Sequence, residues 1–176
     1  MNSSKPTKAT NHLRESSIAV IIPCYRETDH ILDVLANIGD EVKAIYVIDD
    51  ACPDLTGNLV IQKSHDPRVE VIHHSKNKGV GGATFTGYER ALKEGHKVFV
   101  KIDGDGQMPS GDVVRVYKLM KENGLDLAKT YRAKRNDGSY RKLISIVYNI
   151  LFKIMFPGIN AWDMNSKPKI MTREFY

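Results

Sequence analysis

The stretch 98–107 constrains the fold of this chain more than any other, because an apolar run ends there abruptly on two aspartates. The β-branched and aromatic residues of 98–102 predict a strand, and the glycines on either side of Asp105 predict a loop at its carboxyl end. In an open α/β sheet, ligands bind at that end. Asp103 and Asp105 suit a divalent cation such as Mg²⁺, whose other ligands are water and phosphate oxygens. A solvent-exposed Asp-Gly turn is the simpler interpretation of these residues alone, and the rest of the chain reverses that preference.

Length and composition indicate one globular domain. With 176 residues, of which 41% are hydrophobic and 27% charged, the chain can bury a core. Its formal net charge of +5 favours anionic partners without separating nucleic acid from phosphate or lipid headgroups. Cys24 and Cys52 are expected to be buried, reduced thiols. No apolar run follows the first methionine, and none reaches the roughly 18 residues of a membrane span, so we expect a cytoplasmic protein.

Apolar runs alternate with helical patterns throughout 17–176, after a polar tail at 1–16 that we expect to be disordered. Strands are predicted at 18–22, 44–48, 69–72, 98–102 and 125–130. Helices are predicted at 29–37, 55–63, 82–94 and 113–123. This order predicts an α/β fold with a mostly parallel, doubly wound sheet and helices on both faces. The loops after the first, second and fourth strands then share one edge of the sheet.

Two further segments near that edge each have two interpretations. Asp49 and Asp50 follow the second strand, where they either begin a turn and cap the next helix or accept a hydrogen bond from a nucleobase N–H or a ribose hydroxyl. The glycine-rich segment 77–83 could cradle phosphate with backbone N–H groups, but a tight turn with close helix packing is favoured because it lacks a Walker A pattern. His73 and His74 are adjacent on a strand end and should point in opposite directions, so they predict no metal site.

A basic segment at 129–142 carries six basic side chains against one aspartate. Within it, Arg132 follows the last predicted strand and could pair with a phosphate. The segment leads into a predicted amphipathic helix, whose apolar face consists of Leu143, Ile146, Val147, Ile150, Leu151, Ile154 and Met155. We interpret 132–155 as a peripheral membrane contact, with a core helix or a dimer contact as alternatives. Nucleic acid is not an expected partner, because aromatic residues are not interleaved with the basic ones.

Four segments in this order resemble glycosyltransferase family two, which has the GT-A fold: 21–27, 47–56, 77–83 and 103–107. The resemblance runs from about residue 18 to 176, and it is strongest to the dolichyl-phosphate mannose synthase branch and its bacterial polyprenyl-phosphate relatives. It implies a GT-A catalytic domain at 17–176 that is truncated at its C-terminus. Arg26 stands where the family usually has asparagine, and 163–169 departs from the pattern of the mannose synthases, which leaves the sugar and the nucleotide open.

The resemblance implies a metal-dependent, inverting transfer of a sugar from a nucleotide-diphosphate donor to a polyprenyl (dolichyl or undecaprenyl) phosphate. It assigns the nucleotide-sugar pocket to Pro23, Tyr25, Glu27, Ile48, Asp50, Asp103 and Gly104. It assigns Mg²⁺ or Mn²⁺ to Asp103, Asp105 and Gln107. The catalytic residues would be Asp105, Arg132 and Asp163, and the basic residues near the acceptor or donor phosphate would be Lys169 and Arg173. With a glycan hydroxyl as acceptor, Asp163 is the candidate base. Such an enzyme would work at the cytoplasmic face of a membrane.

Two other classes of protein remain as alternatives. A nucleotidyltransferase also combines a parallel sheet with paired aspartates, but it would normally have a basic, glycine-rich loop directly after the first strand. That position here is 23–27, which contains no glycine. A non-catalytic relative that only binds nucleotide sugars is the second alternative, and nucleotide binding without turnover would distinguish it.

Overall fold

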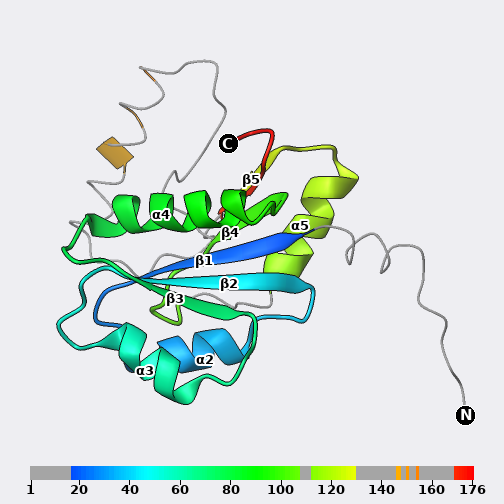
Figure 1. Ribbon diagram of the computed structural model, residues 1–176. Coiled ribbons are helices and arrows are strands. Elements are labelled where there is room, and N and C mark those ends of the chain that lie inside the picture. The colour runs from blue at the N-terminus through cyan, green and yellow to red at the C-terminus, as the bar shows by residue number, and fades with distance from the viewer. Residues whose placement is uncertain (1–16, 108–111, 130–145, 148–149, 151–153, 155–168) are drawn as a thin grey trace, which may run out of the picture.

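In the described part of the chain, six strands form one sheet in the order β3-β2-β1-β4-β6-β5, and helices cover both of its faces (Figure 1). The computed structural model describes residues 17–107, 112–129, 146–147, 150, 154 and 169–176. The strands are β1 (Ile18–Cys24), β2 (Val42–Asp49), β3 (Val69–His73), β4 (Val98–Lys101), β5 (Leu127–Lys129) and β6 (Lys169–Thr172). The helices are α2 (Ile31–Ala36), α3 (Thr56–Lys63), α4 (Gly79–Lys93) and α5 (Asp112–Glu122).

Strand β1 lies at the centre of the sheet and pairs in parallel with β2 on one side and β4 on the other. Its residues Ile18, Val20 and Ile22 belong to the core under α2 and α5, whereas Ala19 and Ile21 belong to the core under α4. Successive side chains of a strand point to opposite faces, so a strand covered on both faces is apolar throughout. This confirms the predicted α/β architecture with a parallel centre.

Strand β6 is an element that the sequence analysis did not predict. It runs antiparallel between β4 and β5, with Lys169 beside both Lys101 and Lys129. Polar and apolar side chains do not alternate along its four residues in a way that predicts a strand. The segment becomes a strand because β4 and β5 each offer an unpaired edge to it, which is information that local sequence does not carry. The sheet is therefore parallel from β3 to β4 and antiparallel at β6.

Helix α4 begins three residues earlier than the sequence predicted. It starts at Gly79, so most of the glycine-rich segment 77–83 is the first turn of the helix rather than a loop. The backbone N–H of Gly79 donates to Asn77 Oδ1 at 2.9 Å, and that of Lys78 donates to Asp50 Oδ1 at 2.9 Å. Two N–H groups of this segment therefore already have partners within the protein, which agrees with the turn-and-packing interpretation of the segment.

Close contact between α4 and β1 depends on a glycine. A Cβ atom built on Gly87 would lie 2.3 Å from Ile21 Cγ2 and 3.0 Å from Ile21 Cγ1. Ile21 is completely buried at the centre of the sheet, so it cannot move aside without disturbing the core. Gly87 thus sets how near α4 approaches the sheet, and α4 in turn carries the segment that lines the edge of the sheet.

We expect Gly87→Ala to lower the free energy of unfolding by about 1–3 kcal/mol, the range for overpacking a well-filled core. Urea unfolding followed by circular dichroism measures this. Gly81→Ala is the matched control in the same helix, because no atom lies within 4 Å of a Cβ built there. It should raise stability by about 0.5–1 kcal/mol through helix propensity. Equal stability of the two variants would contradict the close packing of α4 on β1.

Candidate active site

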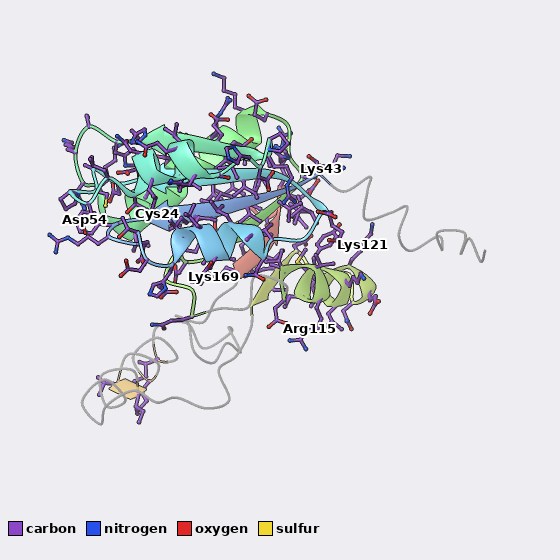
Figure 2. All side chains as sticks on the ribbon, turned by 90° about the horizontal axis from the view of Figure 1, so that it is seen from below. Cys24, Lys43, Asp54, Arg115, Lys121 and Lys169 are labelled. Atoms are coloured by element: carbon purple, nitrogen blue, oxygen red, sulfur yellow. The ribbon has the colours of Figure 1, made fainter. Side chains whose placement is uncertain are left out.

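The carboxyl ends of β1, β2 and β4 and the first turn of α4 enclose a pocket of about 410 Å³. Figure 2 shows Cys24 and Asp54 at this end of the sheet and Lys43, at the start of β2, at the opposite end. The pocket is lined by Pro23, Cys24, Tyr25, Glu27, Asp50, Asn77, Gly79, Val80, Ala83, Asp103, Gly104 and Asp105. Parallel pairing explains this convergence, since it brings the ends of neighbouring strands to one edge.

Asp49 has a structural role at the end of β2. It is buried, and its two carboxylate oxygens accept hydrogen bonds from the backbone N–H groups of Cys52 at 2.8 Å and Gly57 at 2.6 Å. These bonds fix the turn from β2 into α3. The capping interpretation that the sequence left open therefore fits Asp49.

Asp50 lines the pocket, and its Oδ1 is held by two donors. This oxygen lies 2.7 Å from His74 Nδ1 and 2.9 Å from the backbone nitrogen of Lys78. Burial by itself would raise the pKa of Asp50, but the hydrogen bonds from His74 and Lys78, together with the nearby N–H of Gly79, outweigh it and lower the pKa below its usual value. Asp50 is therefore an ionised acceptor at neutral pH.

The loop after β1 is tied to the loop after β2. The backbone N–H of Arg26 donates to Cys52 Sγ at 3.1 Å, and that of Glu27 donates to Thr56 Oγ1 at 3.3 Å. Arg26 has a φ of 63°, a left-handed conformation that asparagine adopts more readily than arginine. This gives a physical reason for asparagine at this place in the family. The guanidinium of Arg26 lies 5.6 Å from the ring centroid of Tyr25, which stands at the mouth of the pocket.

The acidic pair follows β4 directly. Asp103 and Asp105 both line the pocket, and Gly104 between them is packed closely. A Cβ atom on Gly104 would lie 3.2 Å from Cys24 Sγ and 3.3 Å from Glu27 Cγ, so a larger residue would push the loop away from β1. Asp105 Oδ1 accepts a hydrogen bond from the backbone N–H of Gln107 at 3.0 Å, which stabilises the turn.

Lys101 is a buried cation that the sequence analysis missed. Only 5% of it is exposed, and its Nζ forms an ion pair with Asp103 Oδ1. Residues two apart on a strand lie on the same face, so the position of Lys101 two residues before Asp103 was a signal for this pair. The ion pair orients the Asp103 carboxylate and reduces the negative charge that gathers at the pocket.

The acidic pair fits a hard divalent cation that also binds a ligand. Two carboxylates facing one pocket are the usual protein contribution to a Mg²⁺ site. Among the residues that the structure describes, no three His, Cys, Asp or Glu side chains gather around one point. A cation held by Asp103 and Asp105 would therefore need oxygens from water or from a bound phosphate to complete its shell.

The structure does not bring every predicted site residue to the pocket. Ile48 is completely buried in the core under α4 and does not line the pocket. Gln107 is exposed beyond the acidic turn. Lys169 begins β6 beside Lys101, at the pocket end of β4, whereas Arg173 follows Thr172 at the other end, where its N–H donates to Lys97 O at 2.9 Å. Arg132 and Asp163 lie outside the described residues.

The model of the family described as "Glycosyl transferase family 2" matches residues 19–172. The undecaprenyl-phosphate mannosyltransferase of Micrococcus luteus is 29% identical over 159 residues, which are 85% of this chain and 63% of the relative. The dolichol-phosphate mannosyltransferase of Pyrococcus furiosus is 31% identical over 151 residues, which are 81% of this chain and 42% of the relative. The chain thus spans between about two fifths and two thirds of the length of these relatives.

Solved structures show the same fold at lower identity. The glucosyl-3-phosphoglycerate synthase of Mycobacterium tuberculosis in complex with uridine diphosphate matches 97% of this chain and 63% of its own, with a TM-score of 0.69 and 20% identity. A mannosyltransferase of Pyrobaculum calidifontis in complex with GDP-Man and Mn²⁺ matches 89% of this chain and 44% of its own, with a TM-score of 0.61 and 19% identity. The fold is GT-A, and because the family model matches most of the sequence, the chain belongs to glycosyl transferase family 2.

Proposed function

We propose that this glycosyltransferase moves a sugar from a nucleotide-diphosphate donor to a polyprenyl phosphate, with inversion at the anomeric carbon. The observation that carries the proposal is the spacing of the carboxylates in one pocket. Asp50 follows β2, and Asp103 and Asp105 follow β4, with β1 between these strands. Two strand spacings are about 10 Å, which is the scale of the separation between the base and the diphosphate of a nucleotide.

The donor is oriented by this spacing. Its base lies between Tyr25 and Asp50, where the ionised carboxylate accepts a hydrogen bond from a base N–H. Its ribose and diphosphate lie toward Asp103 and Asp105. Glu27, in the loop after β1, also lines the pocket, and its side chain packs beside Gly104. The class of donor agrees with two structural relatives, one of which is in complex with uridine diphosphate and the other with GDP-Man and Mn²⁺.

Mg²⁺ or Mn²⁺ would be held by Asp103 and Asp105. When bound, it would neutralise charge that develops on the departing diphosphate. Lys101 fixes the orientation of Asp103, and Gly104 keeps the pair close to β1. With a cation bound between them, the Asp103 and Asp105 carboxylates would hold the donor phosphates at this end of the pocket before the reaction begins.

The acceptor step needs no strong base if the acceptor is a phosphate. An oxygen of the polyprenyl phosphate attacks the anomeric carbon from the side opposite the diphosphate, the bond from that carbon to the diphosphate oxygen breaks, and nucleoside diphosphate leaves. The attacking oxygen is already anionic. Lys169 begins β6 at the pocket end of β4 and is suited to bind the acceptor phosphate, with Arg132 adding positive charge. If the acceptor is a glycan hydroxyl, Asp163 would accept its proton.

Polyprenyl phosphate is a lipid, so we also propose peripheral contact with a membrane through 132–155, at its cytoplasmic face. Ile146, Val147, Ile150 and Ile154 are helical and about half or more exposed, and their spacing places them on one helical face. Within the described residues, no helix has both the length and the apolar character needed to cross a bilayer. Both cysteines are free thiols, which agrees with a reducing compartment.

We expect Asp105→Ala to lower turnover of the donor by about 100-fold or more, because several kcal/mol of charge stabilisation would be lost. The assay measures release of nucleoside diphosphate from UDP- and GDP-sugars with undecaprenyl phosphate and Mg²⁺ or Mn²⁺. In the presence of nucleotide, electron paramagnetic resonance should show that the Asp105→Ala variant binds Mn²⁺ more weakly than the wild type does. Asp40→Ala is the control, because Asp40 is exposed and lies before β2, at the opposite end of that strand. Turnover by Asp105→Ala at the wild-type rate would reject the metal assignment.

We expect the protein to sediment with anionic liposomes at low salt and not with neutral ones. Ile150→Glu should reduce the bound fraction about fivefold, since roughly 1 kcal/mol of apolar burial is lost at the bilayer surface. Ile61→Glu is the matched control, because Ile61 is also an exposed isoleucine, 61% accessible, but lies on α3. Equal binding to neutral and anionic liposomes, or equal effects of the two substitutions, would contradict the proposed membrane contact.

A further inference from the structure

His74 is a buried histidine beside the pocket to which the proposed reaction assigns no role. Its side chain is only 4% exposed. Ring atom Nδ1 lies 2.7 Å from Asp50 Oδ1, and Nε2 lies 2.9 Å from Thr86 Oγ1 on α4. The backbone N–H of His74 donates to Asp49 O at 2.9 Å, which fixes its main chain to the end of β2. His74 is therefore held by its backbone and by both ring nitrogens.

His73 provides a contrast on the same strand end. Its side chain is 44% exposed, and its Nδ1 is 3.8 Å from Asp49 Oδ2. The two adjacent histidines point in opposite directions, as the sequence predicted. Only His74 reaches a carboxylate that lines the pocket.

The hydrogen bonds determine where the proton of the ring lies. Asp50 Oδ1 also accepts from the backbone N–H of Lys78, and an ionised carboxylate can only accept. Nδ1 of His74 must therefore carry the hydrogen that points to Asp50. At the other side of the ring, Thr86 Oγ1 lies 2.9 Å from Nε2 and 3.1 Å from Gly82 O. A hydroxyl has one hydrogen, so Thr86 donates either to Nε2 or to Gly82 O, and in the second case it accepts from a protonated Nε2.

We propose that His74 is a positioning residue that holds the Asp50 carboxylate as an acceptor for the ring N–H of a nucleobase, and that it thereby sets which bases the pocket takes. This inference rests on the proposed function, in which Asp50 faces the base of the donor. Two donors on one oxygen prevent the carboxylate from rotating and leave its remaining acceptor capacity directed at the pocket. A charge-assisted bond of this kind is stronger than a neutral one.

The consequence is a choice between bases that differ at one ring nitrogen. Uracil and guanine present a ring N–H, whereas cytosine and adenine present a lone pair at the matching position. A fixed carboxylate binds the first pair and repels the second, and a buried polar group left without a partner weakens binding substantially. A carboxylate that is free to turn away would discriminate less.

The test measures dissociation constants for UDP, CDP, GDP and ADP with Mg²⁺ by isothermal titration calorimetry. The wild type should prefer UDP to CDP, or GDP to ADP, by at least about tenfold. In His74→Asn the amide nitrogen replaces Nδ1 and keeps the donor to Asp50. In His74→Gln the amide nitrogen replaces Nε2 and keeps only the contact to Thr86. We expect His74→Asn to retain most of the preference between bases and His74→Gln to reduce it about tenfold. Thermal unfolding measurements should show that both variants are folded.

Thr86→Val gives a second variant that does not touch Asp50, and it should reduce the preference about two- to threefold, the scale of one neutral hydrogen bond. No binding of any of the four nucleotides by the wild type would overturn the proposed function and this inference with it. Binding without preference would overturn the inference alone and would place Asp50 on the ribose. Equal preferences in the Asn and Gln variants would also overturn it, because His74 would then act only as a packing residue.

Discussion

The parallel pairing of β1 with both β2 and β4 is the constraint on which the site depends. It places the end of β2, with Asp50, and the end of β4, with Asp103 and Asp105, on the same edge of the sheet at a fixed separation. The helix that completes the pocket is held to this sheet where Gly87 contacts Ile21. A shift in either the register or the helix would change the distance between the carboxylates, so the packing of the core determines the geometry of the pocket.

The carboxylates of Asp49, Asp50 and Asp103, at the ends of β2 and β4, are each oriented by a donor from the protein. Asp49 accepts from the backbone of Cys52 and Gly57, Asp50 from His74, and Asp103 pairs with Lys101. Buried or half-buried charge is costly without such partners. The same partners also limit how far each carboxylate can turn. A pocket arranged in this way has little reorganisation left when a nucleotide enters, which is the general advantage of a preorganised polar site.

Much of the site could be predicted because its residues follow strands with clear apolar patterns. The edge that carries Tyr25, Asp50 and Asp105 follows from strand order alone, and the family resemblance, which the family model confirms, comes from the same motifs. Residues whose role depends on another segment were not predicted. His74 acts through a carboxylate that follows a neighbouring strand, and β6 exists only because two distant strands leave room for it. Lys101 differs from these, because its partner Asp103 is two residues away and the spacing in the sequence was a signal for the pair.

The sequence by itself determined the alternation of strands and helices, the apolar centre of the sheet and the acidic strand ends, because each of these is written in local periodicity and composition. Only the tertiary structure decided between the two adjacent aspartates. Asp49 stabilises the turn before α3, whereas Asp50 lines the pocket. Neighbouring residues on a strand point to opposite faces, so their surroundings depend on which helix and which loop cover each face, and those contacts join segments far apart in the chain.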